Sequence, residues 1–156
     1  VTLRKNISPY DIVDSAKNIL LGPSAGQDFY FGKVHNNVPY YIQIRHRNSL
    51  ETWSADPVLF SYQQTSIAFS VDAIYAFGNN EIQVDTSPYN VFAFYSGDVN
   101  QDGTIDASDL SDTDNDSFSG LSGYVRTDVT GDNFVDAADV SIVDNNAYSA
   151  VNVVRP

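Results

Sequence analysis

The chain has 156 residues, with 20 acidic against 8 basic residues, and it contains neither Cys nor Met. Residues 1–96 hold eight acidic and six basic residues, a net charge of −2, whereas residues 97–156 hold twelve Asp and two Arg, a net charge of −10. Such a field repels phosphate backbones and anionic lipid surfaces, so we expect no nucleic-acid partner. No apolar run approaches the ~20 residues of a membrane-spanning helix. The lack of Cys excludes disulfides and thiolate metal sites.

Residues 1–96 predict short β-strands separated by turns. Strand-forming runs lie at residues 1–6, 28–34, 38–47, 58–62, 66–71, 81–84 and 90–95. Turn-forming Gly, Pro, Asn and Asp residues lie between them, at positions 22–23, 26, 36–37, 56–57, 78–80 and 87–88. Residues 11–21 fit either a strand or a short helix, and residues 71–77 fit a helical turn. Short strands at this spacing are typical of an all-β sandwich.

The clearest strand, at residues 38–47, leads into the densest group of polar and aromatic side chains. One face of this strand carries Tyr40, Ile42, Ile44 and His46. We expect His46 to be a hydrogen-bonded residue of the inner face rather than a ligand. The group Arg45, His46, Arg47, Glu51 and Trp53 has two interpretations. It is either a carbohydrate platform built on Trp53 or, as we favour, a strand end whose charges pair with Glu51 while Trp53 packs in the core.

The composition changes at Ser96–Gly97, and we place a domain boundary there, between residues 1–96 and 97–156. The second segment is an internal repeat with a period of 30 residues, in which DVNQDGTIDASD (98–109) aligns with DVTGDNFVDAAD (128–139). The match continues into the residues that follow each loop. A repeat of this length indicates a duplicated structural unit.

Each repeat places oxygen donors at positions 1, 3, 5, 7, 9 and 12 of a twelve-residue loop, the spacing of a calcium loop. The first set is Asp98, Asn100, Asp102, the carbonyl of Thr104, Asp106 and Asp109. The second set is Asp128, Thr130, Asp132, the carbonyl of Phe134, Asp136 and Asp139. Two hits at one period favour metal loops over merely solvated acidic loops, and the many-ligand pattern suits Ca²⁺ better than Mg²⁺. We therefore expect two calcium ions.

Position 6 of each loop requires a sharp turn with positive φ. Gly103 meets this requirement in the first loop, and Asn133 replaces it in the second, which is acceptable because Asn tolerates that region better than most residues. Thr130 offers only a neutral hydroxyl, so we expect the second site to be somewhat weaker. We also expect Ile105 and Val135, at position 8 of each loop, to pair in a short strand bridge.

The segment GDVNQDGTIDASDL (97–110) resembles the calcium loop and following helix of type I dockerins, and the resemblance extends over about residues 97–154. Dockerins are secreted bacterial modules of two loop–helix repeats. The resemblance implies Asp at position 12, as Asp109 and Asp139 supply here. In cellulosomes dockerins attach catalytic subunits to cohesins through residues early in each helix. This chain keeps Ser108, Leu110 and Ser111 but lacks the usual basic pair in both repeats, which argues against cohesin binding.

Residues 40–54, together with FGNN at 77–80, resemble Ig-like or transthyretin-like modules. Such modules are joined to dockerin-type repeats at the C-termini of large surface proteins of Bacteroidota-type bacteria. The resemblance implies a secreted or cell-surface location. Because the chain begins at Val1 rather than at Met, we also expect a leader or upstream region to have been removed.

We expect no catalytic activity, because the sequence has no Gly-x-Ser-x-Gly elbow and no glycine-rich phosphate loop. The favoured function is a non-catalytic structural subunit of a bacterial surface assembly, such as a fibre or pilus. Residues 1–7 are extended, alternating and free at one end, so we expect subunits to self-assemble by exchanging this strand, which pairs with an edge strand of another subunit's sandwich. One alternative is a dockerin module that binds a cohesin-like partner. The other is a carbohydrate-binding module.

Overall fold

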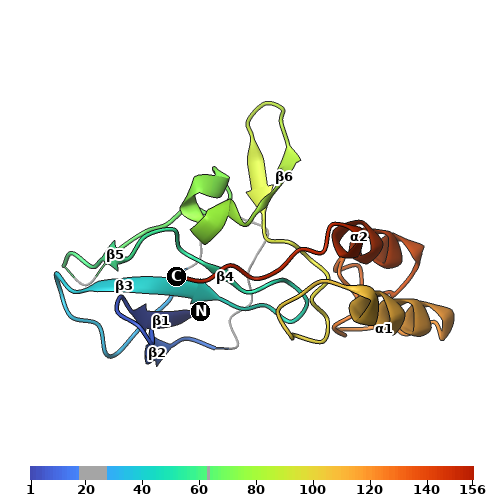
Figure 1. Cartoon of the computed structure of the whole chain (residues 1–156), viewed down its shortest axis with the longest axis horizontal. Helices are drawn as coiled ribbons and strands as arrows, with labels where there is room; N and C mark the ends of the chain where they lie inside the picture. Colours follow the sequence, from blue (N-terminus) through green and yellow to red (C-terminus); the bar gives the residue numbers. More distant parts are fainter. Residues whose placement is uncertain (18–27, 63) are drawn as a thin grey trace.

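The computed structural model describes residues 1–17, 28–62 and 64–156, and it places strands first and two helices last (Figure 1). This order confirms a chain with antiparallel β-sheets and two C-terminal helices. We refer to residues 1–96 as the strand part and to residues 97–156 as the helical part. The elements are β1 (Thr2–Lys5), β2 (Ile12–Ser15), β3 (Pro39–Ile44), β4 (Thr52–Trp53), β5 (Val58–Leu59), the 3₁₀ turns η1 (Ala73–Tyr75) and η2 (Phe77–Asn79), β6 (Ile82–Asp85), β7 (Val91–Ala93), α1 (Ala107–Phe118) and α2 (Ala137–Tyr148).

The main sheet of the strand part is antiparallel, with the order β2-β1-β3-β4 and with β5 also paired to β3. The N-terminal strand β1 therefore lies inside the sheet, where Leu3 is opposite Asp14 of β2 and Ile42 of β3. Leu3 is fully buried, and its core also contains Tyr40, Ile42 and Phe60. The predicted alternation along β3 thus places Tyr40 and Ile42 on the core face. Strands β6 and β7 form a separate hairpin.

Two expected strands, at residues 28–34 and 66–71, are irregular in the structure, so both predictions are wrong. Their backbone forms no ladder of strand hydrogen bonds. Their apolar side chains still reach the core, because Phe31 and Ile67 pack against the cluster around Leu3. In the first segment the Asp14 carboxylate accepts hydrogen bonds from Gly32 N and Lys33 N, which takes the place of strand pairing. The apolar pattern correctly indicated burial but not strand geometry.

The two ambiguous segments are resolved in part. Within residues 11–21 the structure forms strand β2, whereas residues 18–21 and the expected turns at 22–23 and 26 lie outside the described residues. The helical turn expected within residues 71–77 is confirmed as η1, and the Asp72 carboxylate caps it by accepting a hydrogen bond from Ile74 N. The short strand β4 lies outside the expected strands, because residues 52–53 follow the predicted strand at 38–47 and carry no alternating pattern of their own.

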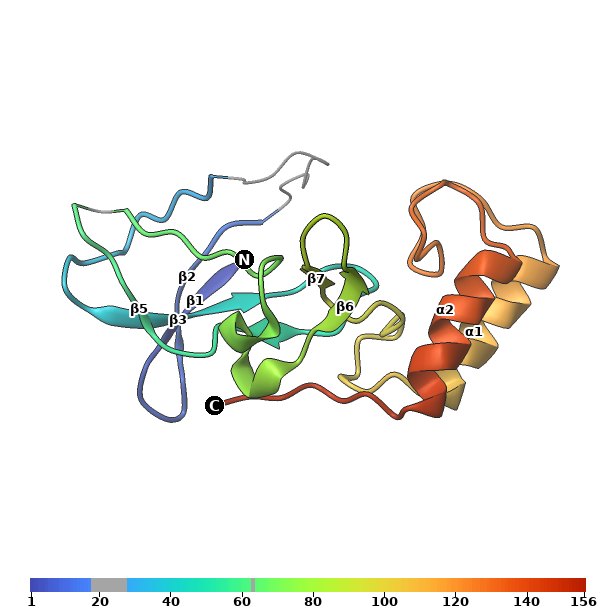
Figure 2. The ribbon, with the colours of Figure 1, turned by 90° about the horizontal axis from the view of Figure 1, so that it is seen from above.

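The two helices begin at equivalent positions of the repeat and lie side by side (Figure 2). Asp106 and Asp136 are the N-cap residues, and the residues three positions later, Asp109 and Asp139, complete a capping box in each helix. These carboxylates also lie at the positive end of the helix dipole, which stabilises their negative charge. Among the described residues, no helix combines the length and the apolar character that a membrane span requires.

The strand part and the helical part share a core. Leu50, in the connection between β3 and β4, packs with Ile105 and Val143 of the helical part. The C-terminal residues run back along the strand part (Figure 1), where Arg155 Nε donates to Glu51 Oε1 at 2.7 Å. On the same path Asn80 Nδ2 donates to the Asn152 carbonyl at 3.1 Å. The two parts therefore contact one another through apolar and polar side chains and not only through the linking peptide.

Candidate metal centre

In the first loop, the Asp at position 12 joins the two ends of the loop. The Asp109 side chain is fully buried, and its Oδ1 accepts hydrogen bonds from Val99 N at 2.8 Å and Asn100 N at 3.1 Å. Its Oδ2 accepts from Asp106 N at 3.1 Å. Positions 2, 3 and 9 are thus held around position 12, so that the loop curls around a common centre.

The second loop repeats this arrangement. The fully buried Asp139 accepts at Oδ1 from Val129 N at 2.8 Å and from Thr130 N at 2.9 Å, and at Oδ2 from Asp136 N at 2.9 Å. The same three bonds at equivalent positions show that the duplication in the sequence is a duplication in structure.

Position 6 of each loop has the expected left-handed conformation, with φ of 93° at Gly103 and 72° at Asn133. This turn brings the position-6 N–H to the carboxylate of position 1. Gly103 N lies 3.4 Å from Asp98 Oδ1, and Asn133 N lies 3.2 Å from Asp128 Oδ2. The position-1 carboxylates are buried and face into their loops, as a metal ligand at that position requires.

The expected pairing of Ile105 with Val135 is wrong. Ile105 N instead donates to the Val151 carbonyl at 2.8 Å, and Val135 N donates to the Leu121 carbonyl at 3.0 Å. Each loop is therefore bonded to the segment that follows the helix of the other repeat. The physical reason is the side-by-side packing of α1 and α2, which brings the end of each helix next to the opposite loop.

These cross-repeat bonds also orient the position-7 carbonyls. On either side of Thr104, the Gly103 carbonyl accepts and the Ile105 N–H donates a hydrogen bond to the other repeat. On either side of Phe134, the Asn133 carbonyl and the Val135 N–H do the same. In an antiparallel bridge, the residue between two such bonds directs its own carbonyl away from the partner segment. The carbonyls of Thr104 and Phe134 thus face their loops, which fits their expected role as ligands.

The first loop carries unbalanced negative charge. Burial raises the pKa of Asp98, and the nearby carboxylates of Asp109 and Asp102 raise it further, although the Gly103 N–H lowers it. Within the described part of the chain, no Lys, Arg or His forms an ion pair with Asp98, Asp109 or Asp139. Buried carboxylates usually have a cationic partner. Asp109 and Asp139 are instead each compensated by three backbone N–H groups, whereas Asp98 lacks comparable compensation.

The donor set of each loop fits calcium by its chemistry, since every donor is an oxygen and four are carboxylates. Across residues 1–17, 28–62 and 64–156, no three acidic or His side chains converge into a ready-made cage. Their oxygens instead bond to the backbone of their own loop, as when Asp102 Oδ1 accepts from Thr104 N and Asp132 Oδ1 from Phe134 N. The second oxygen of Asp102 accepts from Asn100 Nδ2 at 2.9 Å, so a cation at this position would replace that donor.

A comparison of the chain with family models, with curated proteins and with solved structures finds no match. The interpretation of the two loops therefore depends on their residues and geometry. The twelve expected ligands fall into two separate groups of six, one in each loop.

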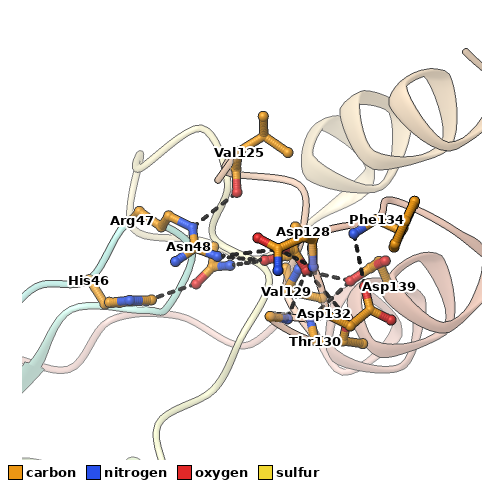
Figure 3. Close-up of polar contacts among 12 residues, drawn as sticks. His46, Arg47, Asn48, Val125, Asp128, Val129, Thr130, Asp132, Phe134 and Asp139 are labelled. Carbon is orange, nitrogen blue, oxygen red and sulfur yellow. Dashed lines mark hydrogen bonds and ion pairs between the residues drawn. The ribbon is translucent and has the colours of Figure 1, made fainter. Parts of the chain in front are cut away.

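The second loop also contacts the strand part, through residues that no sequence pattern connects with the loop (Figure 3). Asn48 Nδ2 donates to the Asp128 carbonyl at 2.7 Å, and Arg47 Nη2 donates to the same oxygen at 3.1 Å. Arg47 also donates through Nε to the Val125 carbonyl at 3.0 Å, and its guanidinium lies 3.9 Å from the centre of the Tyr124 ring. No local sequence pattern links residues 80 positions apart, so only the fold reveals this contact.

The remaining residues of the polar and aromatic group have structural roles. Trp53 is buried, and its Nε1 donates to Glu51 Oε1 at 2.7 Å, so its ring is not presented as a sugar platform. Burial acts to raise the pKa of Glu51, but the hydrogen bonds from Arg155 and Trp53 outweigh it and the pKa is lowered. Arg45 lies 3.5 Å from Glu51 Oε2. The favoured interpretation is confirmed for Arg45, which pairs with Glu51, and for the buried Trp53, but it is wrong for Arg47, which pairs with Asp128 because the second loop lies against it.

His46 is a half-buried residue whose Nδ1 lies 2.8 Å from Asn48 Oδ1. Burial lowers the pKa of His46, the bond to Asn48 raises it, and the charge of Arg47 lowers it again. The net lowering favours a neutral ring. In this state Nδ1–H donates to Asn48 Oδ1, and the other end of the amide is directed at Asp128. His46 is thus a hydrogen-bonded residue, as expected.

Proposed function

We propose that this chain is a non-catalytic, calcium-stabilised structural module of a bacterial surface or extracellular assembly. The observation that carries the proposal is the pair of equivalent loops, each closed by a fully buried Asp at position 12 and rich in carboxylates. In each loop the six expected ligands would hold one Ca²⁺. Calcium supplies positive charge to carboxylates that otherwise repel one another, and two ions reduce the formal charge of −12 to about −8.

The resemblances of the two segments support this proposal. We propose a dockerin-like domain for residues 97–156, on the basis of two loop–helix repeats, and an Ig-like or transthyretin-like module for residues 1–96. The shared core around Leu50 and the bond from Arg155 to Glu51 fit a rigid connection between them. A rigid calcium-filled connection is useful in a surface protein, because it transmits force without a flexible linker.

Removal of calcium is the direct test of this proposal. A ligand that binds only the folded state stabilises it by mass action, by roughly 3 kcal/mol per site at a hundredfold excess over Kd. We expect an excess of chelator to lower the Tm of the full chain, measured by circular dichroism at 222 nm, and added Ca²⁺ to restore it. Mg²⁺ at the same concentration should restore less.

Matched variants identify the loops as the source of this effect. Asp102→Asn and Asp132→Asn alter exposed ligands, and together they should remove most of the calcium-dependent shift. Asp114→Asn removes the same charge from an exposed position of α1 outside the loops and should keep the full shift. A chelator that leaves the Tm of the wild-type chain unchanged would exclude the calcium assignment.

We further propose that assembly uses exchange of residues 1–7 between subunits. In the single chain β1 fills the position between β2 and β3, with Leu3 buried in the core. A second copy could supply the same strand to the same position, because the register and the pocket for Leu3 would be identical. The donor strand in this proposal therefore replaces an internal strand and is not added to an edge.

A chain that lacks residues 1–7 tests this exchange. We expect it to lose self-assembly, seen by negative-stain microscopy, and to have a lower Tm, while the loops at 98–109 and 128–139 still bind calcium. A synthetic peptide of residues 1–7 should restore the Tm, whereas the peptide with Leu3→Ala should not. If the shortened chain still polymerises, the exchange proposal is wrong.

A further inference from the structure

We propose that the strand part completes the second calcium loop: Asn48 and Arg47 are positioning residues for Asp128, which occupies position 1 of that loop. Calcium binding by the second loop is then coupled to the position of residues 46–50, whereas in the first loop the position-1 carbonyl is held by Gln101, a side chain of the same loop. This inference rests on the proposed calcium function and extends it to residues outside the repeat.

The two repeats differ at position 4 of the loop. In the first loop this position is Gln101, whose Nε2 donates to the Asp98 carbonyl at 2.7 Å. The bond holds the backbone of position 1 from inside the loop, and the same Nε2 reaches the Ser49 carbonyl of the strand part only at 3.5 Å. In the second loop position 4 is Gly131, which has no side chain and cannot form an equivalent bond.

The missing bond is replaced from the strand part. The Asp128 carbonyl accepts from Asn48 Nδ2 at 2.7 Å and from Arg47 Nη2 at 3.1 Å. The same oxygen that Gln101 holds in the first repeat is therefore held in the second by two residues about 80 positions earlier in the chain. Figure 3 shows both side chains directed at Asp128.

Both donors are themselves fixed. The amide of Asn48 is oriented by His46, 2.8 Å from its Oδ1, and Asn48 is buried. The guanidinium of Arg47 is held by the Val125 carbonyl and by the Tyr124 ring. Such donors confine the Asp128 backbone to one position, because neither can turn away without losing another contact.

The position of the Asp128 backbone decides where its carboxylate lies. Asp128 is buried, with Oδ1 accepting from Gly131 N at 2.7 Å and Oδ2 accepting from Asn133 N at 3.2 Å. Arg47 Nη2 also lies 3.6 Å from Asp128 Oδ2. Residues that orient a metal ligand without touching the ion typically contribute ten- to a hundredfold to metal affinity.

The test is a calcium titration of the full chain, followed by NMR at one amide in each loop. Gly103 N–H reports the first loop and Asn133 N–H the second, since both occupy position 6. In the Asn48→Ala variant we expect the affinity of the second loop to fall about tenfold and that of the first to change less than about twofold. The backbone bond from Gly97 N to the Asn48 carbonyl is unaffected by this substitution.

A rescue variant separates loss of the bond from general damage. Gly131→Gln restores the side chain found in the first loop, and the structure can accept it. A Cβ at Gly131 meets no atom within 4 Å. The φ of 80° at Gly131 is a left-handed conformation that strains a side chain, but Gln101 adopts the same region at the equivalent position, with φ of 65°. The double variant Asn48→Ala/Gly131→Gln should recover the affinity of the second loop to within about threefold. Arg47→Lys keeps the charge but removes the forked donor, so it should weaken the second loop in the same direction.

The outcomes distinguish this inference from the proposed function. If neither loop of the wild-type chain binds Ca²⁺, the proposed function fails. If both loops bind but Asn48→Ala and Arg47→Lys leave the second loop unchanged, only the inference is overturned. Equal weakening of both loops, or no recovery in the double variant, also overturns it. If Asn48→Ala does not fold, the Arg47→Lys titration decides alone.

Discussion

Replacing Leu50 with Ala is expected to lower the free energy of unfolding by about 3 kcal/mol, within the range for a buried Leu. Leu50 belongs to the strand part by sequence, but it is only 2% exposed and packs with Ile105 and Val143 of the helical part. The substitution leaves a cavity in the core of the repeat pair. Its effect should therefore reach both parts of the chain.

Two probes measure this coupling in urea unfolding at saturating calcium. Fluorescence of Trp53, the single Trp, reports the strand part, and circular dichroism at 222 nm reports α1 and α2. We expect both signals to shift together in Leu50→Ala, since the two parts share the core that is weakened. Leu59→Ala is the matched control, because Leu59 is 56% exposed and should lose less than about 1 kcal/mol.

The result also decides how far the boundary between residues 96 and 97 separates independent domains. If only the helical signal shifts in Leu50→Ala, the two parts unfold separately and the shared core does not couple them. A loss below 1 kcal/mol would show that the Leu50 contact contributes little. If both signals shift together, the boundary between residues 96 and 97 marks a change in composition and does not separate two units that fold independently.

The loops were predictable because all the information needed for them lies within twelve consecutive residues. The spacing of Asp98 to Asp109 and its repetition 30 residues later predicted the closed loops, and the turn residues Gly103 and Asn133 predicted the position-6 conformation. A capping box is equally local, since it depends on residues three positions apart. The closure of each loop by its position-12 Asp can be predicted because its hydrogen bonds lie within the loop itself, whereas the bonds to the other repeat and to Asn48 cannot.

The wrong predictions all depended on distant contacts. Ile105 does not pair with Val135, because the packing of the two helices brings Val151 and Leu121 to the loops instead. Residues 28–34 and 66–71 have apolar side chains that reach the core from irregular backbone, so hydrophobicity indicated burial correctly and strand geometry incorrectly. Asn48 contacts Asp128 only because the strand part folds against the second repeat. The spacing of residues in the sequence does not predict these contacts between distant segments.

Glu81 provides the second large expected effect, as a source of pH dependence outside the two acidic loops. Its side chain is 5% exposed, and neither carboxylate oxygen has a hydrogen-bond partner within the described residues. Burial first, and the nearby charge of Asp72 second, raise the pKa of Glu81 to about 7 from its ordinary value of 4.5. An ionised carboxylate in this position is costly, because nothing compensates its lost hydration.

The sign of the effect follows from the direction of this shift. Between pH 4.5 and 7 the folded chain retains a proton on Glu81 that the unfolded chain has released. The free energy of unfolding therefore falls as the pH rises through this window and reaches a plateau above it. A shift of this size corresponds to about 3 kcal/mol between the two limits.

The Glu81→Leu variant should lack this pH dependence, since it removes the titrating group and leaves an apolar side chain in a buried position. We expect its free energy of unfolding to exceed that of the wild-type chain by about 3 kcal/mol at pH 8 and to differ little at pH 4.5. Asp72→Asn removes only the neighbouring charge, so it should reduce the slope without abolishing it. The measurements require saturating calcium, because the loop carboxylates also bind protons. A Glu81→Leu variant with the wild-type slope would place the titration in those carboxylates and not at Glu81.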